Sequence, residues 1–131
     1  MIDHVTIPVS DLERSKLFYE QAFQPLGYKV SFGEDSYFWA FDIGQGLFEI
    51  ARHEGSNPIT SFHIAFRVKG HEDVHAFYQA AMKAGAKDNG EPGPRPQYTK
   101  NYYACFVLDP DGHNIEAVFD TWGEAARRWT N

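Results

Sequence analysis

The sequence contains a single cysteine, Cys105, among 131 residues, so an internal disulfide cannot form. A chain without disulfides is typical of a reducing compartment, and we expect this one in the cytoplasm. No apolar run approaches the roughly 18 residues that a membrane-spanning helix needs. The first residues also lack the basic-then-apolar pattern of a signal peptide. We therefore expect neither a membrane partner nor secretion.

Basic residues are scarce and scattered. The chain has 12 Lys and Arg against 18 Asp and Glu, a formal net charge of -6, and no Lys/Arg cluster. This balance argues against nucleic acid and anionic membranes as partners. Apolar residues, in contrast, make up 43% of the chain and aromatic residues 16%. At this length, such a composition predicts one packed globular domain over residues 1–131.

A histidine is the second residue of each of two similar segments, DHVTIPV at residues 3–9 and FHIAFRV at residues 62–68. His4 and His63 lie 59 positions apart, and each is followed fourteen residues later by a Phe-Tyr pair. In both segments apolar residues alternate along the chain, which predicts a β-strand. The repeated spacing indicates that the chain contains an internal repeat.

Each of these strands is followed by the pattern of a helix and then of three more strands. Ser10 and Glu13 form a capping box that predicts the start of the first helix. The order β-α-β-β-β thus occurs twice, in a first module over residues 1–53 and a second over residues 60–120. Residues 121–131 fall outside the repeat and predict a short C-terminal helix. The predicted fold class is α+β.

Side chains alternate between the two faces of a strand, so the apolar residues identify the face that a helix covers. In the first strand Val5, Ile7 and Val9 form that face, and His4 points to the opposite one. The same test places one histidine and one glutamate of each module on the face away from its helix. These four residues are His4, Glu49, His63 and Glu116.

If the two sheets curl toward each other, these four side chains converge. Two imidazoles and two carboxylates suit a borderline divalent metal and leave open positions for water or substrate. We therefore predict one divalent metal ion, with Zn or Ni favoured and Co, Mn or Fe as alternatives.

Four further residues are candidates for substrate contacts. A long loop-like stretch, residues 89–101, precedes the seventh strand. Arg95 or Lys100 could hold an anionic group there, and the hydroxyl of Tyr102 could donate to an oxyanion. Trp39 could line the substrate pocket. The alternative interpretation of the loop is a surface segment with amphipathic tyrosines.

The segments HVTIPVSDLERSKLFYEQAF, FHIAFRV and FVLDPDGHNIEAV resemble the vicinal oxygen chelate superfamily. This superfamily includes glyoxalase I, extradiol dioxygenases, fosfomycin-resistance proteins and bleomycin-binding proteins. The resemblance covers nearly the whole chain, and the DPDG sequence followed by a strand with Glu116 is its most specific part. It implies two βαβββ modules in one chain that form a cupped, barrel-like mixed sheet around a metal. That metal would chelate two vicinal oxygens of a small-molecule substrate.

Three-ligand branches of the superfamily would use His4, His63 and Glu116, and the glyoxalase I branch adds a glutamate where Glu49 stands. The resemblance therefore places the chain nearest to lactoylglutathione lyase. Its reaction would be that of a metal-dependent lyase or isomerase that enolises a small α-oxo or α-hydroxycarbonyl substrate. Glu116 would be the better candidate for the base, with Glu49 acting from the opposite side.

Two positions depart from the glyoxalase I pattern. Pro8 and His53 replace residues that are expected to contact glutathione, so another α-oxo or α-hydroxy compound is the expected substrate. Two other functions stay open. One is a ligand-binding protein of the bleomycin-resistance type, and the other is an extradiol dioxygenase-like oxidoreductase.

Open sheet edges also predict a homodimer.

Overall fold

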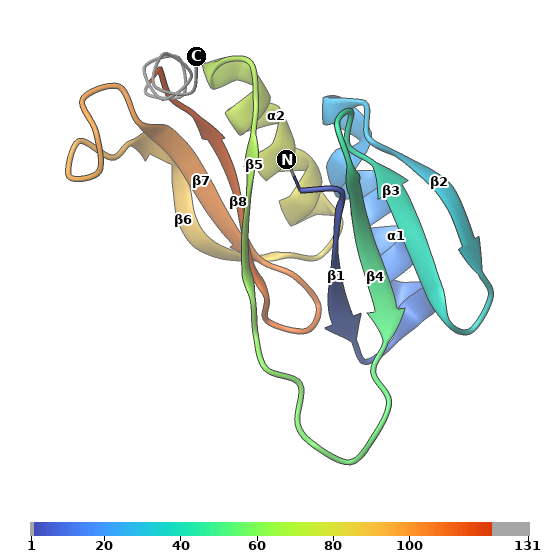
Figure 1. The fold of residues 1–131 in the computed structure, drawn as a ribbon. Coiled ribbons are helices and arrows are strands. Elements are labelled where there is room, and N and C mark those ends of the chain that lie inside the picture. Colours follow the sequence, from blue (N-terminus) through green and yellow to red (C-terminus); the bar gives the residue numbers. More distant parts are fainter. Residues whose placement is uncertain (1, 122–131) are drawn as a thin grey trace.

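The computed structural model describes residues 2–121 and contains two modules of the predicted β-α-β-β-β order (Figure 1). The first module consists of β1 (His4–Val9), α1 (Leu12–Phe23), the short 3-10 helix η1 (Gln24–Leu26), β2 (Lys29–Glu34), β3 (Phe38–Asp42) and β4 (Leu47–Arg52). The second consists of β5 (His63–Arg67), α2 (His71–Lys83), β6 (Lys87–Pro94), β7 (Tyr103–Leu108) and β8 (Asn114–Phe119). The predicted C-terminal helix falls almost entirely outside the described residues.

Each module forms its own four-stranded sheet, in the order β1-β4-β3-β2 and β5-β8-β7-β6. The pairs β1–β4 and β5–β8 are parallel, and the remaining pairs are antiparallel. Figure 1 shows the sheets side by side with both helices behind them. We call the face of each sheet that is turned away from its helix the open face. The α+β class and the paired modules with their cupped sheets are therefore confirmed.

Aromatic side chains from both modules share one core between the sheets and the helices. Phe23 at the end of α1 lies 5.1 Å from Phe66 of β5 and 6.4 Å from Phe77 of α2, measured between ring centroids. Phe48 of β4 also contacts Phe66, at 5.4 Å. Burying one Phe side chain stabilises a fold by about 1.5–3 kcal/mol, so these contacts hold the modules against each other.

The first helix begins one residue later than the predicted capping box implies. The carboxylate of Asp11 caps α1 by accepting a hydrogen bond from the backbone N–H of Arg14, at 3.1 Å. The backbone N–H of Ser10 instead donates to the carboxylate of Asp111, at 3.1 Å. Asp and Ser are equally favourable N-cap residues, so Asp11 can cap the helix in place of Ser10. Ser10 instead forms a polar contact with the second module.

The glycine- and proline-rich segment that was predicted as a loop continues β6 as far as Pro94. Its pairing with β7 is irregular, with register shifts on both sides of Gly90. Gly90 has a φ of 152°, and a Cβ atom there would lie 2.9 Å from the ring of Phe106. Because β6 is an edge strand, it tolerates prolines and irregular pairing that a central strand would not.

The loop between β7 and β8 ties the two modules together through polar contacts. The Nδ1 atom of His113 accepts a hydrogen bond from the backbone N–H of Phe62, at 3.0 Å, and its Nε2 donates to the backbone oxygen of Pro8, at 2.7 Å. The hydroxyl of Tyr19 in α1 donates to the carboxylate of Asp109, at 2.5 Å. The loop therefore fixes β1 relative to β5.

Within the part of the chain described, no helix is long and apolar enough to cross a membrane.

Candidate functional site

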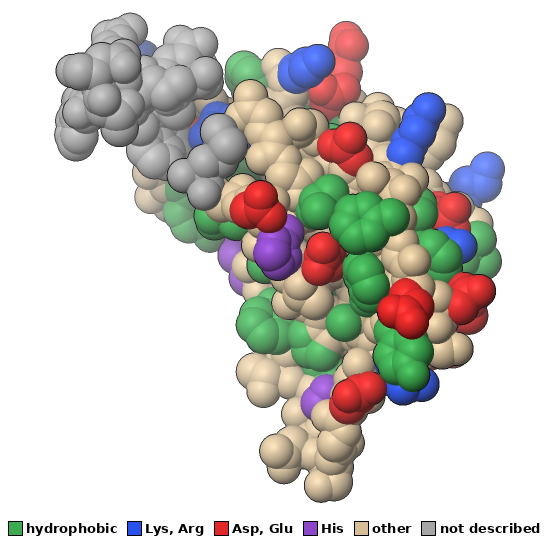
Figure 2. Space-filling view, turned by 45° about the vertical axis from the view of Figure 1, so that its right-hand side comes forward, with side chains coloured by type: hydrophobic (Ala, Val, Ile, Leu, Met, Phe, Trp, Pro, Cys, Tyr) green, Lys and Arg blue, Asp and Glu red, His purple; other side chains and the backbone are tan. Residues whose placement is uncertain are grey.

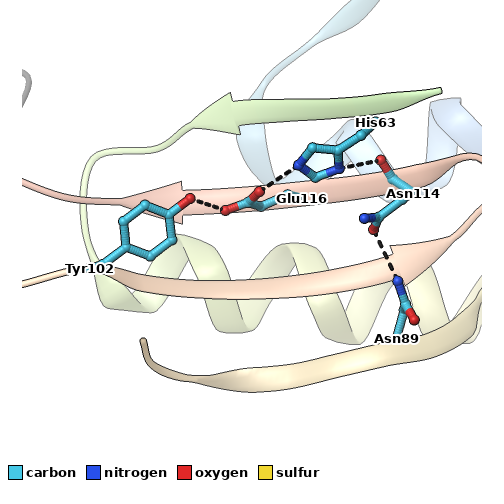
Figure 3. Close-up of polar contacts among 5 residues, drawn as sticks. All are labelled: His63, Asn89, Tyr102, Asn114 and Glu116. Atoms are coloured by element: carbon cyan, nitrogen blue, oxygen red, sulfur yellow. Dashed lines mark hydrogen bonds and ion pairs between the residues drawn. The ribbon is translucent and has the colours of Figure 1, made fainter. Parts of the chain in front are cut away.

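The second module places His63, Glu116 and Tyr102 together on its open face (Figure 3). The Nε2 atom of His63 lies 2.9 Å from one carboxylate oxygen of Glu116, and the hydroxyl of Tyr102 donates to the other. The Nδ1 atom of His63 lies 3.1 Å from the backbone oxygen of Asn114. Since that carbonyl can only accept, Nδ1 donates to it, and Nε2 is the ring nitrogen that faces Glu116. We call His63 and Glu116 the second half-site.

Glu116 is the most enclosed member of this group, with 2% of its surface exposed. A buried carboxylate requires hydrogen-bond partners, and both of its oxygens have one. Burial and the hydrogen bond to Glu116 raise the pKa of Tyr102 well above its ordinary value. The phenol therefore stays protonated at any physiological pH and keeps its role as a donor.

The first module places His4, Thr6 and Glu49 on its open face in the equivalent register. Thr6 pairs with Glu49 across β1 and β4, as Ala65 pairs with Glu116 across β5 and β8. The Thr6 hydroxyl donates to a carboxylate oxygen of Glu49, at 2.9 Å. We call His4 and Glu49 the first half-site.

One nitrogen of the His4 ring is hydrogen-bonded to a neighbouring side chain. Its Nδ1 lies 2.7 Å from a carboxylate oxygen of Asp3, which leaves Nε2 as the nitrogen available to a ligand. The hydrogen bond to Asp3 and the charge of Glu49 raise the pKa of His4. Metal-binding histidines commonly have Nδ1 engaged by a carboxylate or a backbone carbonyl, and His4 and His63 each show one of these two patterns.

The four predicted ligands form two pairs on separate sheets. Among residues 2–121, no group of three or more His, Cys, Asp or Glu side chains lies close enough together to hold a metal. The donor atoms themselves suit a divalent metal, because imidazole Nε2 and carboxylate oxygens are ligands for Zn, Ni, Co, Mn and Fe. Each half-site is thus a fitting but incomplete ligand set, and the four-ligand site stays a prediction.

Two cavities adjoin the half-sites. A cavity of about 480 Å³ beside the first is lined by Thr6, Phe32, Tyr37, Phe38, Glu49, Ala51, Arg52 and Glu54. One of about 450 Å³ beside the second is lined by His63, Tyr98, Tyr102, Phe106, Asn114 and Glu116. A larger cavity of about 1010 Å³ lies at the other end of the sheets, around η1 and the end of β5, and no predicted site residue lines it.

Three residues predicted to contact substrate line neither half-site cavity. Trp39 points to the α1 side of β3, where its ring lies 3.9 Å from the amine of Lys16. Arg95 donates to backbone oxygens of its own loop, including that of Glu91 at 2.8 Å, and stands over the ring of Phe106. Lys100 is exposed in the loop before β7. Of the four predicted contacts, the structure brings only Tyr102 to a half-site.

Three residues in or beside the two cavities were not named as site candidates from the sequence. Thr6 was recognisable, because it alternates with the apolar residues of β1 and so shares a face with His4. Phe32 was not recognisable, because an irregularity in β2 decides which face it occupies. Asn89 donates to the side chain of Asn114 at 3.2 Å, and no pattern in the sequence pairs these residues.

Both the sequence and the fold are similar to those of known proteins. The family model described as Glyoxalase/Bleomycin resistance protein/Dioxygenase superfamily matches residues 1–117. The Metallothiol transferase FosB of Shouchella clausii (strain KSM-K16) is 30% identical over 128 residues, which cover 94% of this chain and 82% of that protein.

Two solved structures share the whole arrangement. A glyoxalase/bleomycin resistance protein from Albidiferax ferrireducens T118 matches with a TM-score of 0.82 and 29% identity, covering 92% of this chain and 99% of that one. The fosfomycin resistance protein FosX from Mesorhizobium loti matches with a TM-score of 0.70 and 25% identity, covering 96% and 97%. The similarity therefore extends over both modules.

Proposed function

Because the chain belongs to the Glyoxalase/Bleomycin resistance protein/Dioxygenase superfamily, we propose that it is a metal-dependent enzyme acting on a small substrate with two adjacent oxygens. One observation carries this proposal: the two half-sites occupy equivalent register positions on the open faces of two equivalent sheets. The engaged Nδ1 atoms of His4 and His63 support it, since each ring then offers Nε2. The proposed reaction is enolisation of an α-oxo or α-hydroxycarbonyl compound.

We place each complete metal site between two copies of the chain. Within one copy the sheets stand side by side and share a core through their helix-covered faces, so the open faces do not oppose each other (Figure 1). A two-fold dimer would bring the first half-site of one copy against the second half-site of the other, twice. It would also cover open sheet edges, which otherwise invite unwanted pairing.

A divalent ion held by these residues would act as a Lewis acid that polarises the substrate oxygens. The protein must then supply a base for the proton on the adjacent carbon, while the electron pair of that C–H bond moves toward the carbonyl oxygen. Glu116 is held by His63 and Tyr102 and is almost fully enclosed. Glu49 is more exposed and has one side-chain partner, the Thr6 hydroxyl. We therefore assign the fixed ligand to Glu116 and the base to Glu49, the reverse of the order predicted from the sequence.

Two variants test this assignment together with metal content. Wild-type protein loaded with Ni or Zn should retain close to one ion per chain after desalting and should exchange the α-proton of a suitable compound with solvent deuterium. The Glu49→Gln variant should keep most of its metal and lose about 10²–10⁴-fold in exchange rate. The Glu116→Gln variant should lose metal as well. Wild-type protein that retains no metal would refute the proposal, and equal metal loss in both variants would refute the separate roles.

The curated relative supports a second candidate. Metallothiol transferase FosB is named for thiol transfer, and the similarity covers almost the whole chain. In this alternative the same half-sites would hold the metal, and a thiol would add to an electrophilic substrate. Incubation of metal-loaded protein with fosfomycin and a panel of low-molecular-weight thiols, followed by mass spectrometry, separates the two candidates. A thiol adduct favours transfer, and deuterium exchange without an adduct favours enolisation.

A further inference from the structure

Three aromatic side chains stand beside Glu49 and are only partly covered by the protein. Phe32 and Tyr37 are 49% and 52% exposed, and Phe38 is half-buried. The rings of Phe32 and Phe38 pack edge to face, with centroids 5.9 Å apart. In the face shown in Figure 2, hydrophobic side chains gather over the first sheet and acidic side chains border them. Contiguous exposed apolar surface commonly marks a binding site, so we expect a ligand or a partner to cover it.

A β-bulge in β2 places Phe32 on this face. Val30 packs against the core on the helix side, and an undisturbed strand would put Phe32 on that side too. The register shifts between Val30 and Phe32, so that Phe32 pairs with Ala40 and faces the cavity. This register requires glycine at position 33, because a Cβ atom there would lie 2.4 Å from the ring of Trp39. Bulges often re-aim a side chain next to a functional site.

The three aromatic residues line one continuous cavity with Thr6 and with Glu49 of the first half-site. Its volume of about 480 Å³ is in the range of pockets that bind small organic molecules. Thr6 and Glu49 form its polar end, and Phe32, Tyr37 and Phe38 form its apolar wall. A substrate held by its oxygens near Glu49 would therefore extend its remaining atoms along the aromatic wall.

The charges around the cavity disfavour an anionic group at the aromatic end. The guanidinium of Arg52 lies 3.3 Å from the carboxylate of Glu54 and stands over the ring of Tyr37, at 5.2 Å. Its charge is therefore already partnered, and Glu49 adds a negative charge. An uncharged planar group suits this environment, because aromatic rings that pack on one another are stabilised beyond the effect of their burial alone.

We propose that Phe32, Tyr37 and Phe38 form a subsite for an uncharged aryl group of the substrate. This inference rests on the proposed function, since it takes the chelated oxygens to lie near Glu49. The substrate class is then an aryl-substituted α-oxo or α-hydroxycarbonyl compound. A small aliphatic compound would leave the aromatic wall uncovered.

Hydroxamates test the subsite because they offer two adjacent oxygens with a variable substituent. Benzohydroxamate should bind metal-loaded protein about tenfold more tightly than acetohydroxamate in calorimetric titrations. The Phe32→Ala variant should lose about tenfold in affinity for benzohydroxamate and keep its affinity for acetohydroxamate. Leu17→Ala removes an exposed apolar side chain from the outer face of α1 and should change neither affinity. Equal affinities of wild-type protein for the two hydroxamates would overturn the proposal.

A metal-free arm separates the subsite from the metal site. Saturation-transfer NMR with benzamide and acetamide on metal-free protein should show contact with benzamide alone, and Phe32→Ala should abolish it. If benzamide binds but no metal does, the proposed function fails and the aryl subsite stands. If metal binds and benzamide does not, the subsite fails alone. Sedimentation compares the oligomeric state of Phe32→Ala with that of wild-type protein. If the two differ, the aromatic wall is an interface between copies and the subsite proposal is overturned.

Discussion

His113 in the second module donates a hydrogen bond from its Nε2 to the backbone oxygen of Pro8 in the first, at 2.7 Å. Its other ring nitrogen accepts from the backbone N–H of Phe62, at 3.0 Å, and its side chain is fully buried. The ring is therefore neutral and bridges the strands that carry His4 and His63. A residue of the DPDGH turn thus fixes the relative position of the two half-sites within each chain.

We expect His113→Ala to destabilise the protein by about 2 kcal/mol or more. The substitution leaves two backbone groups without their partner, and each unsatisfied buried group costs about 1–3 kcal/mol. Urea unfolding followed by circular dichroism measures the loss. His75→Ala is the matched control, because His75 bonds to Tyr103 at the surface and should cost less than about 1 kcal/mol. Equal effects of the two substitutions would contradict the bridging role.

Tyr19 provides a second test of the junction between the modules. Its hydroxyl is buried and donates to the carboxylate of Asp109 at 2.5 Å, and hydrogen bonds to charged groups contribute about 1.5–3 kcal/mol. Tyr19→Phe should therefore lower the free energy of unfolding by about that amount. Tyr78→Phe also removes a hydroxyl bonded to an aspartate, Asp88, but at an exposed site. It should change stability by less than about 1 kcal/mol, and a larger loss there than at Tyr19 would count against the argument.

The single thiol should be inert in the folded protein. Cys105 is fully enclosed, and burial raises its pKa to about 12. At pH 8 the thiolate fraction is then about a thousandfold below that of an ordinary cysteine, before access is considered. Ellman's reagent should detect no thiol in native protein and one per chain in 8 M urea, a denaturing concentration of the order used for small domains. Complete reaction within minutes in native buffer would be incompatible with this placement.

The local patterns that the sequence displays were sufficient for much of this fold. Alternation along β1, β4, β5 and β8 correctly placed His4, Glu49, His63 and Glu116 on the faces away from the helices, because strand alternation depends only on position along the chain. The repeat of His4 and His63 correctly indicated two equivalent modules. The superfamily drawn from the motifs is also confirmed. The glyoxalase I branch, the metal and the dimer stay predictions.

Other features depend on relations that no local pattern records. A bulge turns Phe32 to the open face and brings Gly33 so close to the ring of Trp39, on the neighbouring strand, that no side chain fits there. The bond between Tyr102 and Glu116 joins a loop to β8 across the sheet. The separation of the half-sites follows from how two sheets pack on one core, which alternation within a strand cannot indicate. These are the features that decide what the site can bind.

The separation of the half-sites leads to a test of where each metal site is assembled. His4→Ala damages only the first half-site and His63→Ala only the second. If a site combines half-sites from two copies, each variant alone should bind little metal. A dimer of one His4→Ala and one His63→Ala chain, however, contains one undamaged site and one that is damaged twice.

Mixing the two variants should therefore restore metal binding without any new contact. Random reassortment of equal amounts makes half of the dimers mixed, so the mixture should bind about a quarter of the wild-type metal per chain. The subunits are unfolded together in urea and refolded by dialysis with Ni, and metal is measured after desalting. A mixture of each variant with itself, treated identically, is the control. If every site lay within one chain, no combination of these variants could contain an undamaged one, and the mixture would stay at the level of the single variants.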